Sequence, residues 1–83
     1  MLLHQLLDDY YVPLKAISPR TRNLYDYTLR AFGESLGRPA ETGDLEELQV
    51  ARFLIARTRA CAPATAAKDR AQLRALWEIG RAH

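Results

Sequence analysis

The sequence predicts an all-α domain, a small bundle of four helices. Apolar residues recur at three- and four-residue spacing in four segments, and no stretch alternates apolar and polar residues as a strand does. Proline and glycine separate these segments at short intervals, as in a bundle with short connections. With 83 residues, the chain is expected to form one domain, residues 1–83, with a single modest core.

The first helix is expected within residues 2–11. Its apolar side is formed by Leu3, Leu6, Leu7, Tyr10 and Tyr11. Pro13 is expected to end this helix, because proline disfavours helix at the preceding residue and lacks a donor. Asp8 and Asp9 diverge by about 100° on a helix, so they are interpreted as a solvated edge rather than as a carboxylate pair.

The second helix is expected over residues 19–36. Ser18 is suited to cap its free N–H groups, and Pro19 fits the first turn, where a missing N–H costs nothing. Gly37 is a natural end for the helix, and Pro39 blocks its continuation. The predicted core face consists of Tyr25, Leu29, Phe32 and Leu36.

Two further helices follow a polar loop over residues 38–43. The third is expected to begin near residues 44–46 and to end at about Arg59, with an apolar face of Leu45, Leu48, Val50, Phe53, Leu54 and Ile55. The fourth begins at Pro63 or Ala64, with a core face of Ala66, Leu73, Leu76, Trp77 and Gly80. Trp77 is expected to be the largest core residue, because a buried aromatic ring contributes a large apolar area.

The charge of the chain indicates at most a local basic face. Twelve basic and ten acidic residues leave a net charge of +2, which does not by itself indicate a nucleic-acid partner. Ten of the twelve basic residues are arginine, whose planar fork suits phosphates. Acidic residues gather at residues 44–47, whereas the start of the second helix and the segment from Arg70 to Arg81 are net positive.

The second and fourth helices carry the candidate phosphate-binding features. Arg20 and Arg22 lie outside the apolar stripe at a helix start, where unpaired backbone N–H groups also favour an anion. On the fourth helix, a basic stripe spans about 40° and consists of Arg70, Arg74 and Arg81. Both helices begin with Pro-x-Thr, 44 residues apart, so the two starts are candidates to flank one phosphate-bearing ligand. Solvated arginines on surface helices remain the alternative interpretation.

Other functional classes find little support in the sequence. The single Cys61 excludes an intramolecular disulfide and indicates a reducing, cytoplasmic setting. No apolar run has the roughly 18–20 residues that span a bilayer, and no signal peptide is recognisable. Nothing in the sequence supports a serine or cysteine nucleophile, and the glycines do not form a phosphate-cradling loop. No Cys/His set has zinc spacing, and His4 has no partner at ligand spacing. We therefore expect no enzyme activity, no cofactor and no metal in this chain.

Three stretches taken together resemble a known family. They are Ser-Pro-x-Thr-x-x-x-Tyr-x-x-x-Leu-x-x-Phe at 18–32, Asp-Leu…Val-x-x-Phe-Leu at 44–54, and Thr-x-x-Lys…Leu-Arg-x-x-Trp at 65–77. In this order they resemble the N-terminal core-binding domain of phage-integrase-type tyrosine recombinases, a domain also described as SAM-like. The resemblance covers nearly the whole chain.

The resemblance implies a helical bundle that forms one half of a clamp around DNA, with the second and fourth helices facing the duplex. The DNA-binding residues it implies are Arg20, Thr21, Arg22, Thr65, Lys68 and Arg74. Arg70 stands where an apolar residue is common in the family, so it is either an added DNA contact or a partner for Asp69 or the neighbourhood of Glu78. Lys68 lies on the opposite side of its helix from Arg70 and Arg74, so one docking line cannot centre on all three.

In that family a separate C-terminal catalytic domain carries the arginine-rich active site and the nucleophilic tyrosine. The chain is therefore interpreted as a fragment of a longer recombinase, and none of its tyrosines as the nucleophile. The implied partners are double-stranded DNA, the catalytic domain and other recombinase protomers.

Two alternatives remain open at this point. A helix-turn-helix regulator would need a turn of roughly three or four residues, and the connection over residues 37–43 is longer. A helical protein-interaction module without DNA binding is favoured by the low net charge.

Overall fold

Four helical units build the domain, as the sequence predicts. The computed structural model describes residues 1–81 and contains in that range no strand, only an isolated bridge between Leu2 and Glu41. The prediction of a small all-α bundle is confirmed. The first unit comprises α1 (Leu3–Leu6), a π-helical turn (Leu7–Tyr11) and α2 (Val12–Lys15).

The prediction that Pro13 ends the first helix is wrong. The π-helical turn widens the helix, and the N–H of Val12 donates to the carbonyl of Leu7. The helix then restarts, so that Pro13 stands in the first turn of α2, where a proline is tolerated. The helical unit ends instead at Ala16, which adopts the left-handed conformation with φ of 50°.

The second unit, α3 (Pro19–Leu36), has the predicted bounds. The N–H of Thr21 donates to the Ser18 hydroxyl at 3.2 Å, and Gly37 terminates the helix with φ of 78°. Gly33 is also needed for its size, because a Cβ there would lie 3.0 Å from the carbonyl oxygen of Arg38. The loop after α3 therefore folds back closely against the helix.

The third helix begins later than predicted. Asp44 belongs to a 3-10 turn (Thr42–Asp44), and α4 spans Glu47–Ala60. The carboxylate of Asp44 is buried and accepts hydrogen bonds from the Arg38 guanidinium at 2.5 and 2.7 Å, and from the N–H of Glu41 at 2.7 Å. These bonds hold Asp44 in the 3-10 turn, so that α4 begins only after it. A two-residue connection then leads to α5 (Pro63–Gly80).

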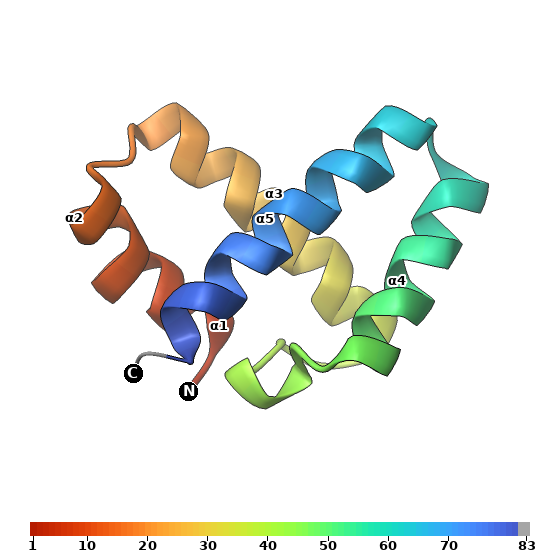
Figure 1. Cartoon of the computed structure of the whole chain (residues 1–83), viewed down its shortest axis with the longest axis horizontal. Helices are drawn as coiled ribbons and strands as arrows, with labels where there is room; N and C mark the ends of the chain where they lie inside the picture. The colour runs from red at the N-terminus through yellow and green to blue at the C-terminus, as the bar shows by residue number, and fades with distance from the viewer. Residues whose placement is uncertain (82–83) are drawn as a thin grey trace.

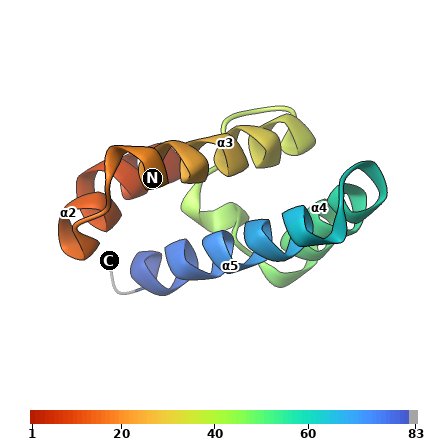
Figure 2. The ribbon, with the colours of Figure 1, turned by 90° about the horizontal axis from the view of Figure 1, so that it is seen from above.

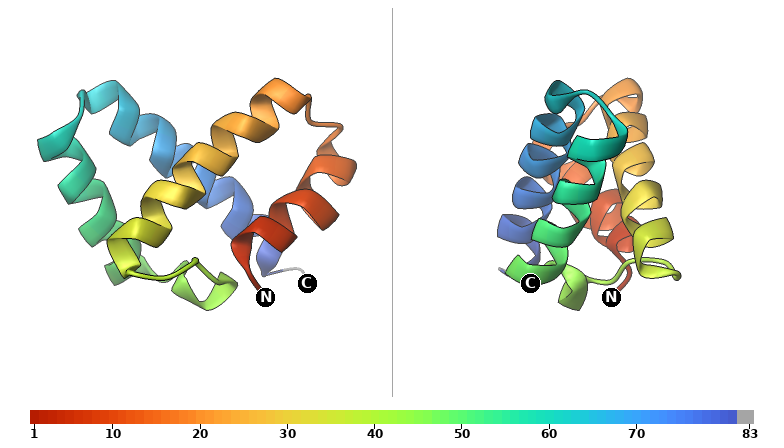
Figure 3. Two further views of the ribbon diagram at one scale, coloured as in Figure 1. Left: turned by 180° about the vertical axis from the view of Figure 1, so that it is seen from behind. Right: turned by 90° about the vertical axis from the view of Figure 1, so that its right-hand side faces the viewer.

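The helices form two layers that cross each other. One layer contains α3 with the first helical unit, and the other contains α4 and α5 (Figure 2). Figure 1 shows α3 and α5 crossing near the centre, and the views in Figure 3 show the same crossing from behind and from the side. The core lies between the layers and includes Leu3, Leu6, Leu7, Leu29, Phe32, Phe53, Leu73 and Leu76. The rings of Phe32 and Phe53 pack with centroids 5.2 Å apart.

Three residues that the sequence assigns to the core lie at the surface. Trp77 is 43% exposed, Leu48 58% and Ile55 54%. The buried side of α5 contains Asp69 and Gln72 in addition to apolar residues. Because these two polar residues occupy part of the inner face, α5 is rotated so that Trp77 stands beside α4 rather than between the layers.

Candidate nucleic-acid interface

The charges of the domain are separated between two opposite edges. The helices α3 and α5 begin, and α4 ends, along the upper edge in Figure 1. We call the segments 16–24 and 56–68 the basic edge, because they contain five basic residues and no acidic one. The lower edge carries segment 33–47, with five acidic residues and one basic. The net charge of +2 therefore conceals a local excess of basic residues at one edge and of acidic residues at the other.

Three cations of the basic edge are available to a ligand. Arg20, Arg59 and Lys68 are exposed, and no other residue in the described range 1–81 forms an ion pair or hydrogen bond with their side chains. Arg20 and Lys68 belong to the predicted site. Arg59 was not predicted, although its position near the end of a basic helix segment is visible in the sequence.

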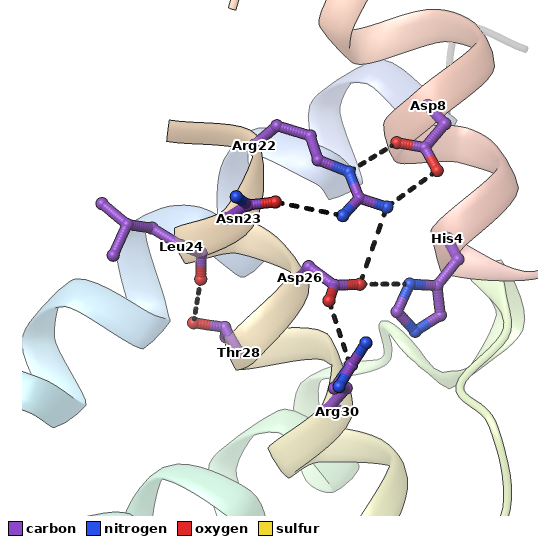
Figure 4. A network of polar contacts seen from close by, with 8 residues as sticks. All are labelled: His4, Asp8, Arg22, Asn23, Leu24, Asp26, Thr28 and Arg30. Carbon is purple, nitrogen blue, oxygen red and sulfur yellow. Dashed lines mark hydrogen bonds and ion pairs between the residues drawn. The ribbon is translucent and has the colours of Figure 1, made fainter. Parts of the chain in front are cut away.

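Arg22 is already paired within the chain (Figure 4). Its Nε and Nη2 donate to the two carboxylate oxygens of Asp8 at 2.8 and 3.0 Å, and Nη1 donates to Asn23 at 3.3 Å. The hydrogen bonds from Arg22 lower the pKa of Asp8 below its ordinary value. Asp8 and Asp9 are both exposed, as expected, but Asp8 in addition binds Arg22, which ties α3 to the first helical unit.

Asp26 extends this network along α3. Its carboxylate lies 2.9 Å from Nδ1 of His4, 3.0 Å from Nε of Arg30 and 3.8 Å from Nη2 of Arg22. His4 thus has a structural partner that its position in the sequence does not reveal. Figure 4 shows how Asp26 lies between these side chains. Over residues 1–81, no group of three His, Cys, Asp or Glu side chains is placed to hold a metal ion.

The two threonines of the predicted site stand at helix starts of different construction. Thr21 is half-buried and its Oγ1 accepts from the Ser18 hydroxyl at 3.1 Å, so it serves the cap of α3. Thr65 is half-buried in the first turn of α5, whose N-cap Ala62 has no side-chain oxygen. Figure 1 places the two helix starts at opposite ends of the basic edge. The two helix starts can therefore flank one phosphate-bearing ligand only if that ligand is extended.

A buried polar network joins the two layers where α3 and α5 cross. Asp69 is 2% exposed and accepts from Nε of Arg57 at 2.7 Å and from the Thr28 hydroxyl at 3.0 Å. Gln72 also contacts the Thr28 hydroxyl, and because a hydroxyl carries one proton, Asp69 and Gln72 share it. The guanidinium of Arg57 lies over the ring of Phe53, 5.8 Å from its centroid. Asp69 is thus the partner of Arg57, not of Arg70.

Sequence reasoning missed this network because its members look like surface residues. Thr28, Asp69 and Gln72 are polar, and Arg57 stands among exposed residues near the end of α4. The available signal is their spacing: Asp69, Gln72 and Leu76 follow the three- and four-residue repeat of a buried face.

Arg70 and Arg74 lie away from Lys68, on the wall of a groove between α4 and α5. The groove has a volume of about 630 Å³. Its apolar lining consists of Leu45, Val50, Ala51, Leu54, Leu73 and Trp77, and its charged lining of Glu46, Glu47, Arg70 and Arg74. Nε of Arg74 is 3.5 Å from Glu78. The predicted site is therefore split between the basic edge and this groove.

Tyr11 and Tyr25 form a pair at the contact between the first helical unit and α3. The hydroxyl groups of Tyr11 and Tyr25 are hydrogen bonded at 2.8 Å, and the two rings pack with centroids 5.0 Å apart. Burial and the bond with Tyr11 raise the pKa of Tyr25 above its ordinary value. A raised pKa makes the phenolate nucleophile harder to form at neutral pH.

Comparison of the chain with protein-family models, with curated proteins and with solved structures yields no match. Within residues 1–81, no helix combines the length and the apolar character that crossing a membrane requires.

Proposed function

We propose that this chain is a double-stranded DNA-binding module that uses the basic edge to hold the DNA backbone. The observation that carries the proposal is the presence on the basic edge of three exposed cations, Arg20, Arg59 and Lys68, whose side chains have no partner within residues 1–81. Contacts between cations and phosphates supply most of the affinity of such modules for DNA, and these contacts do not depend on the base sequence.

The dimensions of the domain suit a duplex better than a small ligand. The molecule extends 34 Å along its longest axis, and the two helix starts of the basic edge lie toward the two ends of that axis. One turn of B-form DNA covers about 34–36 Å. Arg20 near one end and Arg59 with Lys68 near the other can therefore meet phosphates that are separated along the same duplex.

The resemblance in the sequence narrows the proposal further. It favours the core-binding, SAM-like domain of a phage-integrase-type tyrosine recombinase, acting in DNA integration and site-specific recombination. In this proposal the catalytic domain belongs to a longer protein, and further recombinase protomers join on the DNA. A cytoplasmic setting fits the one cysteine of the chain, Cys61, which is a free thiol.

Paired residues of the predicted site have a positioning role in this proposal. The bonds from Arg22 to Asp8 fix the start of α3, which carries Arg20. Thr21 completes the cap of the same helix. Arg20 and Lys68 are the two predicted residues with free cationic groups on the basic edge, and we assign the phosphate contacts to them.

A salt titration tests the assignment. We expect the double variant Arg20→Ala, Lys68→Ala to bind a short labelled duplex more weakly at low salt than the unchanged chain. The slope of log affinity against log salt should fall by about 2, since each lost phosphate contact removes about one unit. Fluorescence anisotropy over a series of salt concentrations measures both quantities.

Arg52→Ala is the matched control for Arg20→Ala. Arg52 is an exposed arginine of α4 outside the basic edge, and its side chain has no partner among residues 1–81. The control should leave the salt slope unchanged. An unaltered slope in the double variant, or an equal loss in the control, refutes the basic edge as the DNA contact.

A helix-turn-helix regulator is the weaker alternative. Between α3 and α4 lies the segment 37–46, which contains a 3-10 turn, instead of a tight turn of roughly three or four residues. A role in protein interaction is favoured by a separate observation, the groove between α4 and α5.

A further inference from the structure

The groove between α4 and α5 leaves apolar side chains uncovered. Trp77 forms part of its wall and is 43% exposed. Leu48 and Ile55 lie one heptad apart on α4, next to Ala51 of the groove wall on the helical repeat, and both are more than half exposed. An exposed tryptophan in a groove, with two exposed aliphatic side chains on one of the two helices that form it, is typical of a protein interface.

Opposite charges mark the two ends of the groove. The pair of Arg57 and Asp69 sets the register of α4 and α5 near their connection. Counting away from that pair along the antiparallel helices, Arg70 comes opposite Ala56, close to Leu54, at one end. Trp77 comes opposite Gln49, and Glu46 and Glu47 follow within one turn of α4 at the other end. Arg70 and Trp77 are seven residues apart, about 10 Å along a helix.

The charges at these ends lack partners within the chain. Arg70, Glu46 and Glu47 are exposed and line the groove, and none of the other residues in 1–81 pairs with their side chains. Arg74, in the middle of the groove, is beside Glu78. The groove thus presents one unpaired cation at one end and two unpaired carboxylates at the other.

We propose that this groove binds the same groove of a second copy of the chain, in a twofold symmetric dimer. A twofold axis through the middle of the groove places the cationic end of each copy against the acidic end of the other. Arg70 of each copy then meets Glu46 and Glu47 of the second copy, and Trp77 packs against the apolar wall around Leu54. Both halves of the charge complementarity are present in one chain, as an isologous interface requires.

The dimer is independent of DNA binding. The proposed DNA contacts, Arg20 and Lys68, do not line the groove. Loss of dimerisation and loss of DNA binding can therefore be measured separately on the same variants.

Sedimentation equilibrium of the chain without DNA tests the proposal, together with the fluorescence of Trp77, the one tryptophan in the sequence. We expect a monomer–dimer equilibrium, with the emission maximum of Trp77 moving to shorter wavelength as the dimer forms. A monomer over the whole concentration range, or a dimer that leaves the emission of Trp77 unchanged, overturns the proposal.

Charge reversal identifies the interface. Arg70→Glu alone and Glu47→Arg alone should each weaken the dimer about tenfold or more, because each creates two repulsive contacts across the twofold axis. Mixing the two variants should restore dimerisation, since the mixed dimer again has opposite charges at both ends. Lys15→Glu, which reverses an exposed charge on α2 outside the groove, should have no effect. Circular dichroism confirms that each variant is folded, and a dimer insensitive to both reversals places the interface elsewhere and refutes the proposal.

Discussion

Replacing Asp69 with alanine is expected to remove a large part of the stability of the domain. The Asp69 carboxylate is 3% exposed and the Arg57 side chain that it binds is 15% exposed. The change deletes the acceptor for Arg57 at 2.7 Å and for Thr28 at 3.0 Å. A guanidinium would then remain inside the protein with no counter-charge.

The expected loss is about 3–5 kcal/mol, the usual cost of removing one partner from a buried ion pair. A domain of this size has a total unfolding free energy of roughly 4–12 kcal/mol. The variant should therefore lose about a quarter of its stability or more. Removing both charges, with Asp69→Leu and Arg57→Met together, should recover most of the loss, because apolar residues of similar volume replace a buried pair at little cost.

Urea unfolding followed by circular dichroism measures these differences. Asp9→Ala is the control, because Asp9 is exposed and has no partner within residues 1–81, and it should change the free energy of unfolding by less than about 0.5 kcal/mol. A loss below about 1 kcal/mol for Asp69→Ala, or a double variant no more stable than the single one, would refute the role of the pair in joining the layers.

Two further predictions concern stability. Hydrogen bonds from Arg38 hold the pKa of Asp44 at about 2, whereas an unperturbed aspartate has a pKa of about 3.9. The stabilisation by ionised Asp44 should be complete above pH 4 and decline as the pH falls toward 2. The difference in urea midpoint between the unchanged chain and the variant Asp44→Asn should therefore shrink over that interval. A difference that stays constant would contradict the prediction. Phe53→Ala should cost about 3–5 kcal/mol, because Phe53 is 2% exposed, and Trp77→Ala less than half as much, because Trp77 is 43% exposed. Urea unfolding at low protein concentration compares the two, and equal losses would place Trp77 in the core after all.

The bounds of the helices follow from local chemistry and were largely predictable. Ser18 caps α3, and Gly37 ends it in the left-handed conformation, as their residue types suggest. Pro13 is the exception. A proline breaks a helix where its missing N–H would have donated a hydrogen bond within that helix. The π-helical turn changes the hydrogen-bond pattern before Pro13, so Pro13 stands in the first turn of α2, where a proline is tolerated.

The side of each helix that is buried depends on contacts between distant segments. Apolar periodicity correctly placed Leu29, Phe32 and Leu73 in the core, because apolar side chains are driven from water wherever the fold allows it. It misplaced Trp77, because the buried face of α5 is shared with the polar residues Asp69 and Gln72. Their burial becomes favourable only when Arg57 and Thr28 arrive from two other helices to satisfy them.

The candidate site shows the same division. By itself the sequence determined the helical class, the start of α3 and the presence of arginines on the second and fourth helices. Only the tertiary structure decided which of these cations are available. Asp8 neutralises Arg22 across 14 residues of sequence. The packing of α5 against α4 places Arg70 and Arg74 in a groove. Arg20 and Lys68 remain on the basic edge. A charge is free or paired according to what the fold places within a few ångströms of it, and the linear sequence does not contain that distance.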